Sequence, residues 1–171
     1  DYVEVKSLAE MTNIVKFLRE SASTKYDWVC VDSLSEIAES VLGEEMGMNK
    51  DGRKAYGETL TKVMSLARSI RDLPINVYMT AKMERVKDEL SGAMLYHPAM
   101  PGQKLGSNLP YLFDMCFALR AEKNSEGQIV RKFQTQPDGQ YYAKDRSGLF
   151  DMFIEPNLSA IADTITRGIT K

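Results

Sequence analysis

Two apolar stretches of the chain run directly into polar side chains. The run WVCV is followed by Asp32 and Ser33, and the run INVYM is followed by Thr80 and, two positions later, Lys82. Short apolar runs bounded in this way are typical of buried strands, and in open α/β sheets ligands bind beyond the carboxyl ends of the strands. We therefore expect Asp32, Thr80 and Lys82 to lie at one ligand-binding edge.

The carboxylate of Asp32 fits two interpretations. An acid that follows an apolar strand is what a P-loop NTPase uses beside its phosphates, because Mg²⁺ keeps several water ligands and an anion can accept their hydrogen bonds. Aspartate is also a preferred N-cap residue, and the following residues, SLSEIAE, have a helical pattern. The strand-and-acid pattern alone leaves both interpretations open.

The periodicity of apolar residues predicts the elements that position these side chains. Helices are expected at residues 8–22, with Ser7 as N-cap, and at 33–43, 56–73 and 158–169. Strands are expected at residues 1–5, 28–31, 75–82, 111–122, 127–136 and 140–144, with KNSEG as a hairpin turn between two of them. This order predicts a single α/β domain over residues 1–171: one mostly parallel sheet flanked by helices on both faces, with an antiparallel hairpin at one edge.

Two glycine-containing, charged segments, residues 43–57 and 83–108, are predicted to be long loops, the second with a short helical turn. Cations with interspersed tyrosines can follow a phosphate backbone and stack bases, as in sequence-tolerant single-strand binders. Acidic neighbours such as Glu84, Asp88 and Glu89 support the alternative of solvated loops. The candidate DNA-binding residues are Lys50, Arg53, Lys54, Arg85, Lys87 and Lys104.

Composition narrows the class of protein. The chain has 171 residues, 43% hydrophobic and 27% charged, as in a globular domain, and a net charge of −2 excludes binding of nucleic acid by bulk positive charge. No apolar run approaches the roughly 18 residues of a membrane span. Cys30 and Cys116 lie inside apolar runs and are expected to be buried thiols in a cytoplasmic setting, and the single histidine, His97, argues against a His/Cys metal site.

The order of these parts resembles the core of RecA-like ATPases. More narrowly, DWVCVDSLSEIAE, DGRKAYGETLTKVM, IRDLPINVYMTAK, PGQKLGSNLPYLFDMCFAL and YYAKDRSGLF are similar to phage-encoded RecA-like P-loop ATPases of the nucleotide-binding, single-strand-annealing recombination family. The similarity covers most of residues 26–158.

The resemblance implies a set of roles. Asp32 would be the acid that holds Mg²⁺ through water, Ser33 its neighbour at the nucleotide edge, and Thr80 and Lys82 would sense the γ-phosphate. It also implies ATP and Mg²⁺ as cofactors, and single-stranded DNA, further copies of the chain in a ring or filament, and a single-strand-binding protein as partners. The location would be the host cytoplasm.

Lys144-Asp145-Arg146 is a second informative motif. In ring- and filament-forming relatives, a Lys-x-Arg pair on a strand reaches the γ-phosphate of the neighbouring subunit, and alternation along a strand would place Lys144 and Arg146 on one face. Cations supplied in this way stabilise the transition state, with rate effects of roughly 10³ or more for arginine fingers. The alternative is a solvated charged turn before Gly148.

The phosphate cradle of a P-loop enzyme is missing from this sequence. No glycine is followed by Lys-Ser or Lys-Thr. The first residue is Asp1 rather than methionine, so we expect the cradle to precede residue 1, and residues 1–171 alone not to hydrolyse ATP. The predicted function is that of an ATP-binding, DNA-dependent ATPase of phage recombination that anneals single strands. The alternative is a non-catalytic DNA-binding or assembly module that keeps the fold but has lost the cradle.

Overall fold

A computed structural model describes residues 1–87 and 92–169 of the chain. The chain divides into two compact units. The first unit comprises residues 1–84 and 98–112, and the second comprises residues 85–97 and the chain from Phe113 onward. Part of the second predicted loop, residues 88–91 with Asp88 and Glu89, lies outside the described residues.

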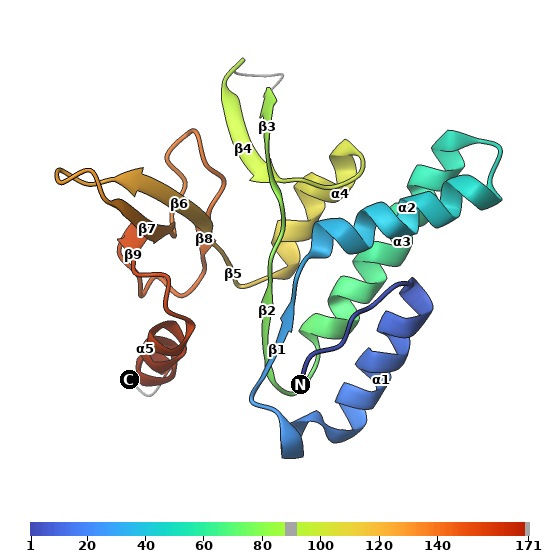
Figure 1. Cartoon of the computed structure of the whole chain (residues 1–171), viewed down its shortest axis with the longest axis horizontal. Helices are drawn as coiled ribbons and strands as arrows, with labels where there is room; N and C mark the ends of the chain where they lie inside the picture. The colour runs from blue at the N-terminus through green and yellow to red at the C-terminus, as the bar shows by residue number, and fades with distance from the viewer. Residues whose placement is uncertain (88–91, 170–171) are drawn as a thin grey trace. The chain divides into compact units, whose positions relative to one another are not determined.

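The first unit contains three long helices and a parallel strand pair (Figure 1). Its α1 helix begins at the predicted N-cap, since Ser7 Oγ accepts a hydrogen bond from the Glu10 N–H at 3.2 Å. The elements of this unit are α1 (Leu8–Lys25), β1 (Trp28–Val31), α2 (Leu34–Met48), α3 (Gly52–Arg71), β2 (Asn76–Met79), α4 (Gln103–Asn108) and a 3₁₀ turn (Leu109–Leu112).

Strands β1 and β2 pair in parallel, with Val31 opposite Met79. One core joins these strands to α1 and α3, because apolar residues spaced by three and four positions give each helix one apolar face. Figure 1 shows both helices on the same side of the strand pair. The buried core residues are Met11, Val15, Leu18, Val31, Leu66, Ile70 and Leu73, with Val29, Val77 and Met79 packed against them.

The prediction of a loop over residues 43–57 is wrong. Helix α2 continues through Gly43 and Gly47 to Met48, and α3 begins at Gly52. Only residues 49–51 connect the two helices, and the Asp51 carboxylate caps α3 by accepting a hydrogen bond from the Arg53 N–H at 2.9 Å. The cations of this segment therefore lie on a helical hairpin.

Tertiary contacts explain why these glycines do not end α2. The Glu45 side chain is buried, forms an ion pair with Lys62 of α3, and accepts a hydrogen bond from the Asn49 amide at 3.1 Å. Glycine costs a helix interior about 1 kcal/mol relative to alanine, a penalty that packing against a neighbouring helix readily exceeds.

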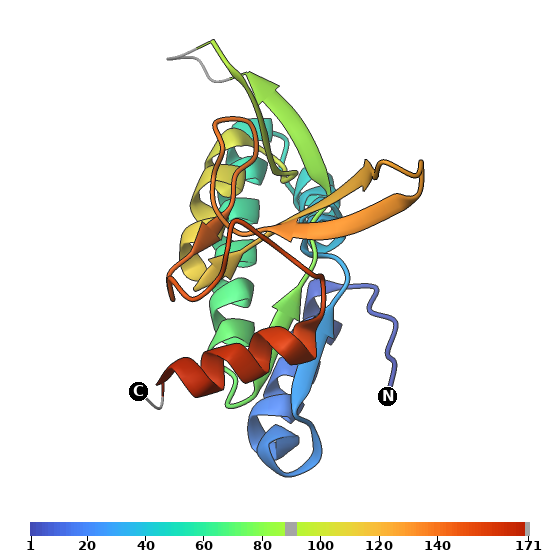
Figure 2. The same ribbon diagram turned by 90° about the vertical axis from the view of Figure 1, so that its left-hand side faces the viewer.

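The second unit consists mainly of short strands (Figure 2). The predicted hairpin is confirmed: β6 and β7 are antiparallel, with Ala118 opposite Gln134 and Lys123 opposite Ile129. The predicted C-terminal helix is also confirmed as α5, and the Asn157 side chain accepts the Ala160 N–H at its start. The elements are β3 (Met83–Lys87, which begins in the first unit), β4 (Met94–Pro98), β5 (Met115–Cys116), β6 (Ala118–Lys123), β7 (Ile129–Gln134), β8 (Lys144–Asp145), β9 (Phe153–Ile154) and α5 (Leu158–Ile169).

The fold is α/β as predicted, but the single, mostly parallel RecA-like sheet is not observed. Among the described residues the strands form four small sheets: β1–β2, β3–β4, β5–β8 and β6–β7–β9. The β5–β8, β6–β7 and β7–β9 pairs are antiparallel. Several of these strands have only two residues, and such short strands cannot extend one continuous ladder.

Three further expectations are corrected. Residues 1–5 alternate like a strand but form none, and Tyr2 is 91% exposed, because alternation alone does not supply a pairing partner. The predicted loop over residues 83–108 contains the strands β3 and β4, whereas α4 agrees with the short helical turn expected there. Cys30 is exposed rather than buried, since it lies on the β1 face opposite the α1–α3 core, whereas Cys116 is partly buried.

None of the helices in the described part of the chain has the length and apolar character needed to cross a membrane.

One buried hydroxyl fixes the chain that leaves β2. Ser35 is fully buried on α2, where its Oγ accepts the Lys82 N–H at 2.9 Å and donates to the Ala99 carbonyl at 2.7 Å. The Ala99 N–H in turn donates to the Lys82 carbonyl at 2.7 Å. Ser35 therefore links Lys82, which directly precedes β3, to Ala99, which directly follows β4.

We predict that Ser35→Ala lowers the free energy of unfolding by about 2 kcal/mol, because it removes a buried hydroxyl and leaves the part-buried Lys82 N–H and Ala99 carbonyl without this partner. Urea unfolding of the wild type and the variant measures the difference. Ser40→Ala, at an exposed position of the same helix, is the matched control and should change stability by less than about 0.5 kcal/mol. Equal stability of the Ser35 variant and the wild type would contradict the assigned role.

Candidate functional site

Asp32 and Thr80 meet at the carboxyl end of the β1–β2 pair, as the sequence predicts. Thr80 Oγ1 donates a hydrogen bond to Asp32 Oδ1 at 2.5 Å. The Thr80 backbone is bound as well, since its N–H donates to the Val31 carbonyl at 3.0 Å and its carbonyl accepts the Leu34 N–H at 2.9 Å. Three hydrogen bonds made by Thr80 therefore hold the segment that contains Asp32 against the end of β2.

The N-cap of α2 is Ser33, not Asp32. Ser33 Oγ accepts the Glu36 N–H at 3.3 Å, and the peptide bond between Asp32 and Ser33 is cis. The capping role that the sequence left open for Asp32 is therefore filled by its neighbour. The Asp32 carboxylate, which is exposed, keeps an oxygen besides the one that Thr80 binds.

Lys82 lies against α2. Its Nζ is 3.2 Å from Glu36 Oε2 and 3.0 Å from both carboxylate oxygens of Glu39. These hydrogen bonds, that to Glu39 first and that to Glu36 second, raise the pKa of Lys82 above its ordinary value. All three side chains are at least half exposed, so Lys82 is a protonated cation held by a solvent-accessible ion pair.

The donor set at this edge fits Mg²⁺ only through water. Asp32 supplies one carboxylate and Thr80 one hydroxyl, and in residues 1–87 and 92–169 no three His, Cys, Asp or Glu side chains form a metal-binding group. Mg²⁺ in nucleotide sites is typically held by one or two carboxylates together with phosphates and several waters. Asp32 can therefore accept hydrogen bonds from metal-bound waters, whereas the described residues alone do not form a complete cage.

Lys144 and Arg146 belong to the second unit. Lys144 lies in β8 opposite Cys116, and β8 ends at Asp145. Burial raises the pKa of the Cys116 thiol to about 11, with Lys144 acting in the opposite direction. The Arg146 guanidinium, 65% exposed, is 3.0 Å from Asp114 Oδ1, and the Arg146 N–H donates to the Asp114 carbonyl at 3.1 Å.

The turn that the sequence offers as an alternative at this motif is present. Asp145 Oδ1 accepts hydrogen bonds from the Ser147 N–H at 2.8 Å and from the Ser147 hydroxyl at 2.6 Å, and Gly148 has a φ of 66°. Because the strand ends before Arg146, alternation along a strand does not determine where its side chain points. The Arg146 side chain is exposed at this turn. Its contact with the γ-phosphate of a neighbouring subunit stays a prediction.

The candidate DNA-binding cations are divided between the two units. Lys50, Arg53 and Lys54 lie at the connected ends of α2 and α3, all of them exposed, and Lys104 is exposed on α4. Arg85 and Lys87 are exposed on β3, in the second unit. The structure therefore groups three of the six on one helical hairpin and two on one strand.

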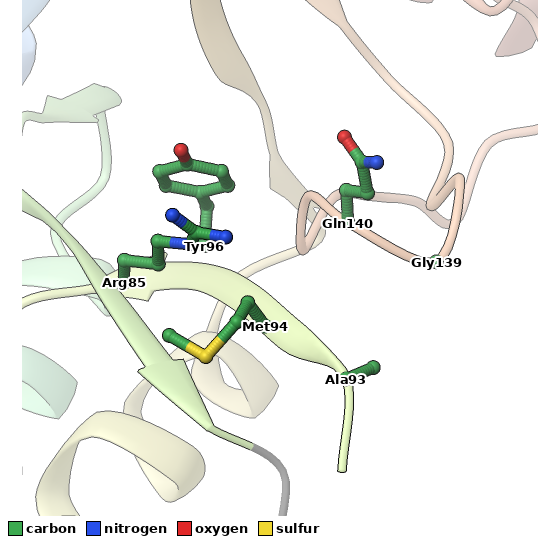
Figure 3. A pocket seen from close by; sticks show the side chains of 6 residues that line it. All are labelled: Arg85, Ala93, Met94, Tyr96, Gly139 and Gln140. Carbon is green, nitrogen blue, oxygen red and sulfur yellow. The ribbon is translucent and has the colours of Figure 1, made fainter. Parts of the chain in front are cut away.

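Arg85 also lines an open pocket of about 440 Å³ in the second unit (Figure 3). Figure 3 shows Arg85 beside Tyr96, with Gly139 and Gln140 on the facing loop. The guanidinium carbon of Arg85 is 5.9 Å from the Tyr96 ring centre. The lining residues are Arg85, Ala93, Met94, Tyr96, Gly139 and Gln140.

The sequence did not identify the partner of Tyr96 within this unit. The Tyr96 ring stacks on the Tyr141 ring, with centroids 4.5 Å apart. The guanidinium carbon of Arg120 is 4.3 Å from the Tyr141 ring centre. The only available signal was the strand pattern of QYYAK, which predicts extended backbone but no particular neighbour. Long-range pairing of this kind cannot be inferred from local periodicity.

Residues 1–147 match the family model described as an AAA domain. The match covers the strand-end residues Asp32 and Thr80 and the Lys144–Arg146 motif. The chain matches no curated protein and no solved structure. Since the family model covers most of the 171 residues, the chain belongs to the AAA-domain family of P-loop, ATPase-like nucleotide-binding domains.

Proposed function

We propose that this chain is part of a RecA-like recombination ATPase that uses ATP and Mg²⁺, acts on single-stranded DNA and promotes strand annealing. The observation that carries the proposal is the hydrogen bond between Thr80 and Asp32 at the carboxyl end of two parallel strands, in a chain of the AAA-domain family. This is the edge at which α/β sheets bind their ligands. The order of elements up to β2, with the Lys144–Arg146 motif after it, supports the RecA-like assignment.

In the proposed nucleotide site each residue at the strand ends has one role. Asp32 would hold Mg²⁺ through water, and Thr80 holds the Asp32 carboxylate in place. Ser33 starts α2 beside this edge, and Lys82, two positions after Thr80, would sense the γ-phosphate. Residues 1–171 contain no Gly-Lys-Ser/Thr sequence, so the roles proposed here are those of the strand-end residues alone.

The exposed guanidinium of Arg146 supports assembly with further copies of the chain. Its ionic partner, Asp114, is 81% exposed, and such a pair is weak enough to exchange for a phosphate. In this proposal Arg146, with Lys144, reaches the γ-phosphate bound by a neighbouring subunit. Both side chains would neutralise charge that develops during hydrolysis, and Mg²⁺, when bound, would supply further positive charge there.

We expect Asp32→Asn, tested in the full-length protein, to lower Mg²⁺-dependent ATP hydrolysis by roughly a hundredfold, because the neutral amide no longer attracts metal-bound water. Phosphate release at saturating ATP measures the effect. Asp27→Asn, which changes an exposed aspartate at the opposite end of the same strand, should retain wild-type turnover. Normal turnover in the Asp32 variant would refute the assignment, and a wild type that binds DNA without hydrolysing ATP would favour the non-catalytic alternative.

Arg146→Ala should reduce hydrolysis by roughly 10³-fold while an isolated subunit still binds ATP with wild-type affinity, because the guanidinium acts on a neighbour's nucleotide. Mixing Arg146→Ala with Asp32→Asn subunits should restore part of the activity, since each mixed interface can combine an intact acid with an intact arginine. Arg131→Ala, at an exposed position of β7, is the control. Equal loss of binding and hydrolysis, with no recovery on mixing, would argue for a role within one subunit.

The cations at the α2–α3 connection are proposed to contact the phosphates of single-stranded DNA. Replacing Lys50, Arg53 and Lys54 together by glutamine should reduce the magnitude of the slope of log affinity against log salt concentration by about 2. Each single-strand phosphate contact contributes about 0.7 to this slope. Fluorescence anisotropy of labelled oligothymidylate between 50 and 300 mM salt, roughly the range over which such contacts are resolved, measures the slope.

A second triple replacement, in the N-terminal part of the first unit, controls for the change in net charge. It removes three exposed lysines that precede β1: Lys6, Lys16 and Lys25. An equal change of slope in both triple variants would show that net charge, rather than the helical hairpin, determines DNA affinity.

A further inference from the structure

The chain that leads to Lys144 and Arg146 passes first through a turn fixed by Asp138. The Asp138 carboxylate accepts hydrogen bonds from the Gln140 N–H at 2.9 Å and the Tyr141 N–H at 2.8 Å. Arg120 of β6 binds the same carboxylate at 3.3 Å and donates to the buried Gln134 side chain at 2.8 Å. The turn is therefore attached to the β6–β7 hairpin before the chain continues.

Directly after this turn the chain pairs with Tyr96 of β4. The Tyr96 N–H donates to the Gln140 carbonyl at 2.6 Å, and the Tyr142 N–H donates to the Tyr96 carbonyl at 2.9 Å. The Tyr96 and Tyr141 rings are stacked, 4.5 Å apart and 12° from parallel. Two backbone hydrogen bonds and one ring stack thus join the segment to Tyr96, and the rings of Tyr142 and His97, the next residue of β4, lie 5.4 Å apart.

A cation lies at each end of this ring pair. The Arg120 guanidinium carbon is 4.3 Å from the Tyr141 ring centre, a short cation–π distance, whereas that of Arg85 is 5.9 Å from the Tyr96 ring centre, near the limit of such contacts. Arg85 is exposed and lines the open pocket (Figure 3). Arg120 therefore anchors the stack, and Arg85 is the member that can leave it for a ligand.

Beyond Tyr141 the chain reaches its two cations within five residues. Ala143 is buried, Lys144 is paired with Cys116, and the Arg146 N–H donates to the Asp114 carbonyl. An extended chain advances at most about 3.5 Å per residue, so Lys144 is at most about 10 Å along the chain from the stack. Because Lys144 follows Tyr141 by only three residues, few rotatable bonds can absorb a displacement of β4 at Tyr96 before it reaches Lys144.

We propose that the Tyr96–Tyr141 stack is a positioning element that ties Lys144 and Arg146 to β4, so that a nucleic-acid strand bound at Arg85 and Lys87 changes the placement of these two cations. The regulatory half of this inference rests on the function proposed above. Arg85 transmits the signal because a phosphate that binds its guanidinium removes it from the Tyr96 ring. Tyr96 and Tyr141 are positioning residues and touch no reacting atom.

The test compares Tyr141→Ala with Tyr141→Phe in the full-length protein. Phenylalanine keeps the stacked ring, whereas alanine removes it. Amide hydrogen exchange of residues 142–146 should become about tenfold faster in the alanine variant and stay as in the wild type in the phenylalanine variant. The amides of β6 and β7 should keep wild-type exchange rates, which shows that the unit is still folded. Unchanged exchange at residues 142–146, or equally faster exchange throughout β6 and β7, would overturn the tether.

The second measurement is ATP hydrolysis with and without oligothymidylate. Tyr141→Ala should lose most of the stimulation by the oligonucleotide while its affinity for the oligonucleotide stays within about twofold of the wild type, because Tyr141 is not among the DNA-binding residues. Faster exchange at residues 142–146 together with full stimulation would overturn the coupling. A wild type that does not hydrolyse ATP would refute the proposed function and the regulatory half, whereas the exchange comparison would still decide the tether.

Discussion

The candidate site depends on the hydrogen bonds of one residue, Thr80. Its N–H and carbonyl bind Val31 and Leu34, which flank the chain leaving β1, and its hydroxyl binds Asp32 between them. A strand pair of four residues each has few ladder hydrogen bonds of its own, so these extra contacts extend its order to the loop that carries the acid. The hydrogen bonds of Thr80, at the end of β2, therefore position Asp32. Because Thr80 also binds the Leu34 N–H, they position the start of α2 after its N-cap Ser33 as well.

This part of the structure could be predicted from the sequence because the relevant signals are local. An apolar run followed by a polar residue marks the end of a buried strand, and two such ends meet when the strands are parallel neighbours, as β1 and β2 are. The α1 and α5 helices are equally local, since their apolar residues recur at steps of three and four. The sequence leaves open whether Asp32 caps α2, because Asp32 and Ser33 are both good capping residues and only the hydrogen bond to Glu36 distinguishes them.

The rest could not be predicted because it depends on contacts that are distant in the sequence. Glycines and charges at residues 43–57 indicate a loop, yet the burial of Glu45 against Lys62 keeps α2 and α3 helical almost to their connection. Strand β3, MERVK, has every side chain exposed, so it carries no alternation that would mark it as a strand. Tyr96 and Tyr141 are separated by 45 positions, and nothing in either local pattern indicates their stack.

The ion pairs around Lys82 and Arg146 have a common physical property that bears on the proposed chemistry. Both cations are held by carboxylates in solvent, where the net stabilisation of a pair is small and is screened by salt. A buried pair would resist exchange, because breaking it leaves an uncompensated charge away from water. An exposed carboxylate instead orders the side chain loosely and can be replaced by a phosphate, whose charge and bidentate geometry bind a guanidinium more strongly. Glu36 and Glu39 for Lys82, and Asp114 for Arg146, are thus compatible with cations that change partner when nucleotide arrives.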